Sequence, residues 1–399
     1  MRRYNGPRSR VIPLTIAIVL GSVVLAAPSA HAGTQQIGRL QLDKYRLDWT
    51  PPRTSAQTAA LRQQSAAATP IQDFTKRIID GSTTFTYTMI GKDPFVQQAA
   101  PSTTIKTYLQ PVVFHFANGH NYDPTVADSC DLGASPLKRT QQSPVFNAQT
   151  WSFGGKSVGS AQYVDASQRA EFYTQTKPTG VNPGYHVNLT LVTLAKITVN
   201  VPAASSTEGT TSCGNRLFGA IEIGYWDNLV QHTLLHNMAA KGLTLRDFPL
   251  FVFKNVVMYI GNPGQCCVLG YHNSMGTGTT FQSYGNALYN SAHLFSSSGC
   301  NCDDVAVMTH EVSEWMNDPD TSNATKPWGN IGQVQGCQNN LETGDPLSGT
   351  SVSDVLNGHT YHVQELAFYS WFYHHKPSQG INGWYSDFGK FRVAASPCP

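Results

Sequence analysis

One segment of the chain, residues 302–319, constrains the fold more than any other. Its apolar residues recur at helical spacing and form a stripe: Val305, Met308, Val312 and Trp315. At roughly 100° per residue, His310 and Glu314 lie about half a turn from that stripe, one above the other. Glu311 lies between the two faces. The segment therefore predicts a helix that packs on one side and carries ionisable groups on the other.

Short polar residues mark both ends of this helix. Asp303 or Asp304 is expected to cap its first turn, because a short acceptor side chain can bind the unpaired N–H groups there. Asp318 and Pro319 are expected to end it, since the residue before a proline is pushed out of the α region.

The polar face has the spacing of a helical metal site. In the H-E-x-x-H motif, two histidines four residues apart bind zinc, and the glutamate after the first is the general base. Here His310 and Glu311 fill the first two positions and Glu314 replaces the second histidine. A carboxylate is an acceptable zinc ligand, so the replacement keeps the site and makes it more anionic. The alternative is a surface helix with one solvated histidine and two glutamates.

The start of the chain reads as a secretory signal, residues 1–32. Four arginines precede an apolar run from Val11 to Ala27, and Ala30-His31-Ala32 is an A-x-A cleavage site. The formal net charge of +2 includes those four arginines, so the mature chain carries about −2. This balance gives no support for nucleic-acid binding, and no later stretch is long and apolar enough to span a membrane. We expect a secreted protein.

All eight cysteines follow the signal, and an even number in an exported chain predicts disulfides of undetermined connectivity. Cys300 and Cys302 could instead offer two thiolates to a metal, which the oxidising compartment makes the weaker interpretation. Five of the eight cysteines flank the H-E-x-x-E region, so the chain is expected to be most tightly cross-linked there.

The rest of the chain predicts an α+β protein, with a mixed or antiparallel sheet packed on the central metal-site helix. Residues 33–101 form an N-terminal arm or a removable pro-segment, and residues 102–399 form the α+β domain. Strands are expected at 107–116, 185–201, 248–260 and 266–272. Further helices are expected at 163–173, 226–241 and 361–375, and a loop at 276–289.

Other histidines compete for the metal role. His232 and His236 are four apart on a predicted helix, but no carboxylate lies between them to act as a base, and we interpret them as ordinary helix residues. His115 and His120 flank a turn and are expected to be surface or packing residues. His272 ends a predicted return strand, where packing is the first interpretation and reaching the metal site is the alternative.

The last third of the chain resembles secreted H-E-x-x-E proteins of the plant Exordium or phosphate-induced kind, and uncharacterised bacterial secreted proteins. The residues that carry this resemblance are His310 to Glu314, Asp318-Pro319, and Glu342 to Asp345. It implies an extracellular protein without settling whether that protein is an enzyme.

The same residues resemble zinc peptidases that combine H-E-x-x-H with a distant E-x-x-D, which implies a zincin-like fold. By that resemblance Glu342 is the third zinc ligand, and Asp345 orients the histidine from the second coordination shell. Glu314 departs from the pattern, and puts metal identity and catalytic competence in question.

Together these observations predict a secreted zinc-dependent hydrolase, a peptidase that acts on extended peptide or protein substrates. His310, Glu314 and Glu342 would hold zinc, Asp345 would orient His310, and Glu311 would be the base. The first alternative is a non-catalytic extracellular or cell-wall protein with a structural or vestigial metal site. The second is a glycosidase that uses two carboxylates such as Glu311 and Glu342.

Overall fold

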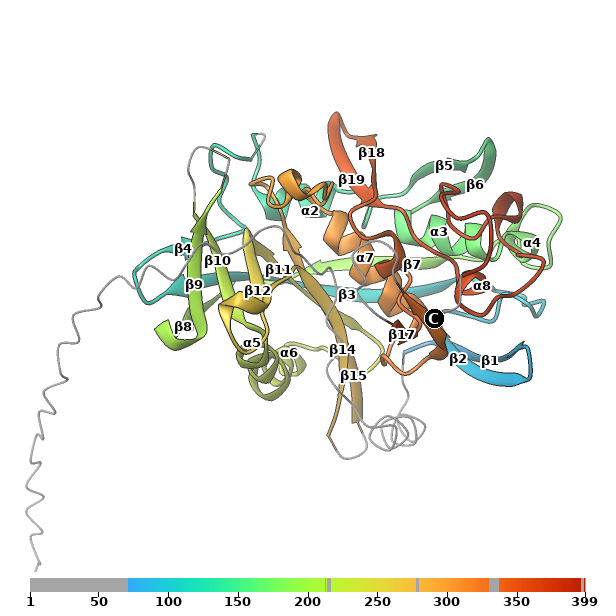
Figure 1. Ribbon diagram of the computed structural model, residues 1–399, viewed down its shortest axis with the longest axis horizontal. Coiled ribbons are helices and arrows are strands. Elements are labelled where there is room, and N and C mark those ends of the chain that lie inside the picture. Colours follow the sequence, from blue (N-terminus) through green and yellow to red (C-terminus); the bar gives the residue numbers. More distant parts are fainter. Residues whose placement is uncertain are drawn as a thin grey trace, which may run out of the picture. The chain divides into compact units, whose positions relative to one another are not determined.

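The computed structural model describes residues 71–395, apart from 132, 212, 214–216, 278, 279 and 330–336, together with Cys398 (Figure 1). The predicted signal at residues 1–32 and the following residues 33–70 lie outside this part. Within it, no helix is long and apolar enough to cross a membrane.

The largest sheet has seven strands and mixed direction, which confirms the predicted α+β class with a mixed sheet. Its path runs β14-β15-β11-β3-β4, and β7 and β8 also pair with β3. The strands are β3 (Thr103–Phe116), β4 (Asn121–Tyr122), β7 (Val187–Thr193), β8 (Ile197–Val201), β11 (Phe248–Lys254), β14 (Gly270–Thr277) and β15 (Thr280–Tyr289). β11 runs parallel to β3 and β15, whereas β14 and β15 are antiparallel. All seven residues of β11 are buried, as expected for a strand at the centre of a mixed sheet.

A second sheet has the order β13-β12-β10-β9. Its strands are β9 (Ser206–Thr210), β10 (Leu217–Glu222), β12 (Val256–Tyr259) and β13 (Cys266–Val268). The helix predicted at 226–241 is present as α5 (Ile223–Leu229), a π-helical turn (Val230–Leu234) and α6 (Leu235–Ala239). Trp226 anchors it, because its ring makes edge contacts with Phe114, Phe251 and Phe253.

The remaining elements cover and connect these sheets. They are β1 (Asp73–Asp80), β2 (Thr83–Ile90), α2 (Pro136–Gln142), β5 (Gln149–Phe153), β6 (Lys156–Ala161), α3 (Tyr163–Glu171), α4 (Tyr173–Thr176), β16 (Ala324–Gly329), β17 (Cys337–Asn340), β18 (Ser351–Leu356), β19 (His359–Gln364) and α8 (Tyr369–Phe372). Six short 3-10 or π segments complete the described part: Ala203–Ser205, Val230–Leu234, Pro263–Gln265, Ser296–Ser298, Asp345–Leu347 and Ile381–Gly383.

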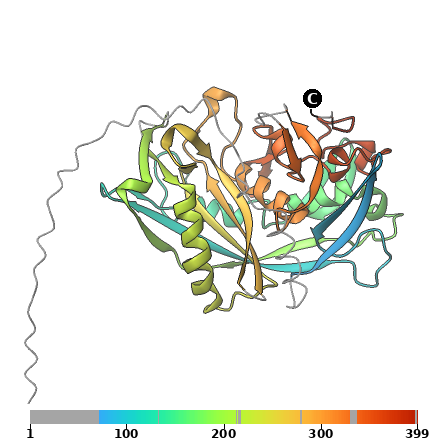
Figure 2. The same cartoon turned by 60° about the horizontal axis from the view of Figure 1, so that its bottom comes forward.

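The helix predicted from the H-E-x-x-E segment is α7, Ala306–Asn317. Figure 2 shows it in orange, beside the green helix α3 and away from the yellow-green run of α5 and α6. It packs against β14, β15, β19 and β2. Trp315, on the predicted apolar stripe, stacks on Phe248 with ring centroids 3.7 Å apart. All twelve residues of α7 are buried, so its polar face also lies inside the protein.

The predicted N-cap of α7 was wrong. Val305 is the N-cap residue and makes no side-chain capping bond. Both aspartates have other partners: Asp303 Oδ2 lies 2.7 Å from His293 Nδ1, and Asp304 Oδ2 lies 2.7 Å from His362 Nδ1. Asp304 also has a φ of 44°, outside the extended conformation that an N-cap residue adopts.

Two other local predictions were wrong. Of the expected loop at 276–289, residues 276 and 277 end β14 and residues 280–289 form β15, because tertiary partners bind its polar side chains. Ser283 accepts a hydrogen bond from the indole of Trp315, and Asn286 accepts one from that of Trp226. The expected helix at 361–375 is divided between β19 and α8, with alternate residues Tyr361 and Val363 buried as a strand requires.

The hairpin β1–β2 shows that part of the predicted N-terminal arm belongs to the packed fold. The ring of Tyr87 lies 5.4 Å from that of Tyr369 and 5.7 Å from that of Tyr373. Asn323 binds the backbone of Thr88 on both sides, accepting from its N–H and donating to its carbonyl. Removal of this hairpin would expose those aromatic residues.

The cysteines form four disulfides, which confirms the predicted oxidised pairs. They join Cys130–Cys213, Cys266–Cys267, Cys300–Cys302 and Cys337–Cys398. Cys300 and Cys302 are therefore bonded to each other rather than available as two thiolates for a metal. The bond between Cys337 and Cys398 ties β17 to the C-terminal residues.

Candidate metal centre

Three ionisable side chains of α7 are completely buried: His310, Glu311 and Glu314 each have a relative exposure of 0%. The helix lies between the β14–β15 hairpin and β19, so its polar face meets protein rather than water. Buried charges are retained only where they are paired, hydrogen-bonded or bound to a metal. The partners of this face therefore determine what the site can do.

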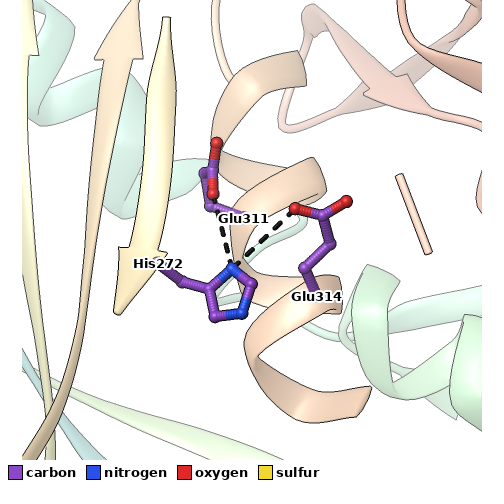
Figure 3. A group of neighbouring side chains, drawn as sticks. All are labelled: His272, Glu311 and Glu314. Carbon is purple, nitrogen blue, oxygen red and sulfur yellow. Dashed lines mark ion pairs between the residues drawn. The ribbon is translucent and has the colours of Figure 1, made fainter. Parts of the chain in front are cut away.

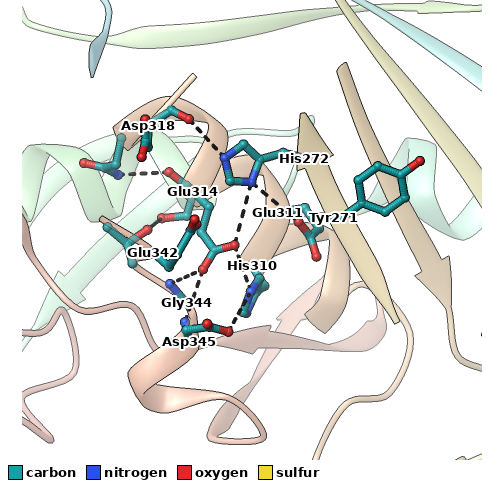
Figure 4. A network of polar contacts seen from close by, with 12 residues as sticks. Tyr271, His272, His310, Glu311, Glu314, Asp318, Glu342, Gly344 and Asp345 are labelled. Carbon is teal, nitrogen blue, oxygen red and sulfur yellow. Dashed lines mark hydrogen bonds and ion pairs between the residues drawn. The ribbon is translucent and has the colours of Figure 1, made fainter. Parts of the chain in front are cut away.

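The first partner is within α7 itself. His310 Nε2 lies 2.9 Å from Glu314 Oε2, as the spacing of four residues predicts. Asp345, at the start of a 3-10 turn after β17, places its Oδ1 3.9 Å from the same nitrogen. Figure 4 shows these three side chains converging.

The other ring nitrogen of His310 is fixed by Gln364, the last residue of β19. His310 Nδ1 lies 3.1 Å from Gln364 Oε1, and Gln364 Nε2 donates to the carbonyl of Gly344 over 2.6 Å. A carbonyl only accepts, so the amide nitrogen must face Gly344 and the amide oxygen must face His310. Nδ1 therefore carries the proton of the neutral imidazole, and its Nε2 directs a lone pair toward Glu314.

A second histidine reaches the same carboxylate from β14. His272 is also fully buried, with Nδ1 3.8 Å from Glu314 Oε2 and 3.9 Å from Glu311 Oε2 (Figure 3). Its Nε2 lies 3.0 Å from the carbonyl of Asp318, which can only accept. In the neutral ring, Nε2 carries the proton and the lone pair of Nδ1 points at the two glutamates.

Glu314 is thus the shared member of the cluster. Its Oε1 accepts the backbone N–H of Gly344 over 2.9 Å and that of Asp345 over 3.2 Å (Figure 4). These two bonds fix one oxygen of the carboxylate. They hold the other oxygen, Oε2, between the two histidines.

Two glycines make room for the cluster. A Cβ added at Gly344 would lie 2.3 Å from His310 Nδ1, and one added at Gly270 would lie 2.5 Å from Glu311 Oε1. Neither distance is compatible with a side chain unless the neighbouring atoms move. The close approach of backbone to His310 and Glu311 therefore requires glycine at both positions.

The alternation of β14 separates this cluster from a second polar network. Tyr271 points away from the site (Figure 4), and its hydroxyl donates to Asp227 Oδ1 over 3.0 Å. Burial raises the pKa of Tyr271 well above its usual value of 10, and the nearby Asp227 carboxylate adds to the effect. Tyr271 is therefore a neutral hydrogen-bond donor outside the cluster of candidate ligands.

The E-x-x-D resemblance predicted roles for Glu342 and Asp345, and only Asp345 belongs to a group of candidate metal ligands. Glu342 is fully buried, and its Oε1 accepts a hydrogen bond from the side-chain amide of Asn340. Asp345 instead lies beside Nε2 of His310, while Gln364 meets Nδ1, the atom that an orienting residue would bind. The resemblance gave Asp345 the orienting role, and the observed contacts give that position to Gln364.

Two groups of ligand atoms in the described chain lie close enough together to hold a metal ion. One consists of His310, Glu314 and Asp345, and the other of His272, Glu311 and Glu314, with ligand atoms within 4.8 Å of one another. Neither group includes Glu342. Imidazole and carboxylate ligands suit several divalent ions, among them zinc.

Sequence reasoning did not find the role of Gln364, and it gave His272 a packing role first. The signal for His272 was present, as a histidine in the strand just before the metal-site helix. Gln364 gave no local signal, because it lay within a segment predicted to be helical. By contrast, His232 and His236 are exposed on the run of α5 and α6, apart from both ligand groups.

Comparisons with known proteins do not extend these observations to a family. No protein-family model, no curated protein and no solved structure gives a significant match to the chain. The functional argument therefore rests on the geometry of the site.

Proposed function

We propose that this protein is a secreted metal-dependent hydrolase, and that His310, Glu314 and Asp345 hold its zinc ion. The observation that carries the proposal is the convergence of two buried histidines and two further carboxylates, Glu311 and Asp345, on Glu314. A closed structural zinc site uses four protein ligands, whereas a catalytic site uses three and leaves the fourth position to water or substrate. This cluster has groups beyond those that one ion requires.

Glu311 is the candidate base in this proposal. Its carboxylate lies on the same face of the cluster as the shared Glu314, and His272 lies 3.9 Å from its Oε2. Glu311 would take a proton from the attacking water and pass it to the nitrogen that leaves when an amide bond breaks. A bound zinc ion would supply positive charge that acidifies water and polarises a carbonyl group.

Contacts that hold the proposed ligands in place support this assignment. Gln364 holds the His310 ring so that Nε2 faces Glu314, and the backbone of Gly344 and Asp345 orients the Glu314 carboxylate. Such contacts fix ligand geometry before a metal binds. We assign Asp345 rather than Glu342 as the third ligand, because Asp345 belongs to the group of mutually close atoms.

Export and an oxidising compartment fit the four disulfides and the absence of a membrane-spanning helix among the described residues. The main alternative is a non-catalytic extracellular protein in which the metal holds the fold together. Burial favours it, because every member of the two groups has a relative exposure of 2% or less. A hydrolase must open a path to this site for its substrate.

Two variants separate these functions. Glu311→Gln keeps the shape of the side chain but removes the proton acceptor, so we expect turnover to fall by about 10² to 10⁴ while the ion at His310 stays bound. His310→Ala removes a ligand, so we expect both metal and activity to fall. The assay is a broad peptide library with purified mature protein, with and without a chelator, alongside metal analysis by mass spectrometry.

His293→Ala is a suitable control, because His293 is exposed and binds Asp303 outside the cluster. Its metal content and activity should equal those of the unmodified protein. If the unmodified protein binds no metal, or if no cleavage is suppressed by the chelator, the hydrolase proposal fails. Metal binding without such cleavage would support the structural alternative.

A further inference from the structure

We propose that a second divalent cation binds between His272, Glu311 and Glu314, and shares Glu314 with the ion at His310. This inference rests on the proposed function and concerns the regulation of the same site. Figure 3 shows the three side chains, which come from β14 and from successive turns of α7. The one-ion hydrolase described above has no ligand role for His272.

The orientation of His272 is the first argument. Its Nε2 lies 3.0 Å from the carbonyl oxygen of Asp318, which fixes the ring, and its Nδ1 lies toward Glu311 and Glu314. All three side chains have a relative exposure of 0%. Imidazole and carboxylate groups that converge inside a protein in this way are typical metal ligands.

The separations of the ligand atoms are the second argument. Zinc binds nitrogen and oxygen ligands at about 2.0–2.2 Å, so two ligands of one ion can lie up to about 4.2 Å apart. His272 Nδ1 lies 3.8 Å from Glu314 Oε2 and 3.9 Å from Glu311 Oε2, both within this limit. All three ligand atoms lie within 4.8 Å of one another, so small side-chain shifts would bring them to one ion.

The position of Glu314 is the third argument. Its Oε1 is held by two backbone N–H groups, which leaves Oε2 fixed toward both histidines. The shared oxygen lies 2.9 Å from His310 Nε2 and 3.8 Å from His272 Nδ1. Two-metal sites place their ions about 3.5–4 Å apart, and a carboxylate held between two histidines is suited to bridge such a pair.

The surroundings of the site are buried and acidic. Five carboxylates of this network have relative exposures of 0% to 2%: Glu311, Glu314, Asp318, Glu342 and Asp345 (Figure 4). A divalent cation bound among them would offset negative charge at this depth.

The second ion would have a functional consequence. Glu311 is the proposed base, and a carboxylate that binds a cation is a poor proton acceptor. Filling the second site would therefore suppress turnover, and activity would be greatest with one equivalent of metal. Metal availability outside the cell would then control the enzyme through His272 and Glu311.

Native mass spectrometry of the full mature protein, freed of metal and titrated with zinc chloride, counts the ions directly. We expect two zinc ions per chain, with the second bound more weakly. His272→Ala should retain one ion and weaken the second by about tenfold or more. Glu311→Gln, which keeps the shape of the side chain, should also weaken only the second ion, and it serves if the histidine variant fails to fold.

His293→Ala is again the matched control, since it removes an exposed histidine that is outside both groups, and it should bind two ions. Unmodified protein that binds only one zinc ion, or both variants binding two ions with unchanged affinity, would overturn the second site. One bound ion together with chelator-sensitive hydrolysis would leave the proposed function intact. Binding of no ion would refute the proposed function itself, so the two failures are distinguishable.

Discussion

Replacement of Gly344 with alanine would test whether the cluster depends on close packing between backbone and imidazole. The added Cβ would lie 2.3 Å from Nδ1 of His310, 2.5 Å from its Cγ and 2.6 Å from its Cε1. Ordinary contact needs a separation of roughly 3.5 Å, so the ring or the loop must move by about 1 Å. Glycine is needed at this position because any side chain there would collide with the His310 ring.

The cost of this movement can be worked from the bonds it disturbs. Gly344 donates its N–H to Glu314 Oε1 and accepts from Gln364 Nε2, which in turn holds His310. Overpacking costs about 1–3 kcal/mol, and a lost hydrogen bond to a charged group costs about 1.5–3 kcal/mol. We expect the free energy of unfolding to fall by roughly 2.5–6 kcal/mol if both costs apply.

Guanidinium denaturation and a zinc competition assay on the same samples measure the two effects. We expect a lower midpoint of denaturation, and a loss of zinc affinity of about 10–100-fold because ligand orientation is disturbed. Gly184→Ala is the matched control, since its added Cβ would meet only Pro101 Cγ at an ordinary 3.6 Å. If Gly344→Ala matched this control in both assays, the packing argument would be refuted.

Three further changes have defined outcomes. Burial raises the pKa of Glu171 to about 8 while its carboxylate accepts the N–H of Tyr369, so the folded protein binds this proton more tightly than the unfolded chain. Unfolding free energy should therefore fall as pH rises from about 4.5 to 8, and Glu171→Gln should reduce that fall in denaturation series at several pH values. Cys398→Ser opens a disulfide with a sequence separation of 61 and should lower thermal stability by about 2–5 kcal/mol, as measured by calorimetry. Gln364→Leu removes the acceptor for His310 Nδ1 and should weaken zinc binding by about 10–100-fold in chelator competition. Gln364→Glu keeps an acceptor at this position and should weaken zinc binding less than Gln364→Leu does.

Helix α7 could be predicted because its information is local. The apolar spacing that ends with Trp315 gave a helix at 302–319, and the structure has one at Ala306–Asn317. The contact between His310 and Glu314 follows from the same periodicity. The capping residues could not be predicted in this way, because Asp303 and Asp304 bind histidines that are distant in sequence.

The β14–β15 hairpin could not be predicted from composition. Its second strand contains glycine, serine and asparagine, which favour loops in isolation. In the fold, Ser283 and Asn286 accept hydrogen bonds from the buried indoles of Trp315 and Trp226, so polar residues fit within a buried strand. Tertiary contacts thus override local preference, and the same contacts bring His272 to the cluster.

The second group of candidate ligands is a property that sequence spacing could not reveal. Residues four apart on a helix specify one pair of ligands, His310 and Glu314, and leave open what approaches from elsewhere. The approach of His272 depends on a hairpin, and the direction of each lone pair depends on acceptors at Asp318 and Gln364. The carbonyl of Asp318 binds one ring nitrogen of His272, and the amide oxygen of Gln364 binds one ring nitrogen of His310. The other nitrogen of each ring faces Glu314 Oε2, so this carboxylate is shared by both histidines. Because both candidate ligand groups contain Glu314, the cluster could bind either one metal ion or two.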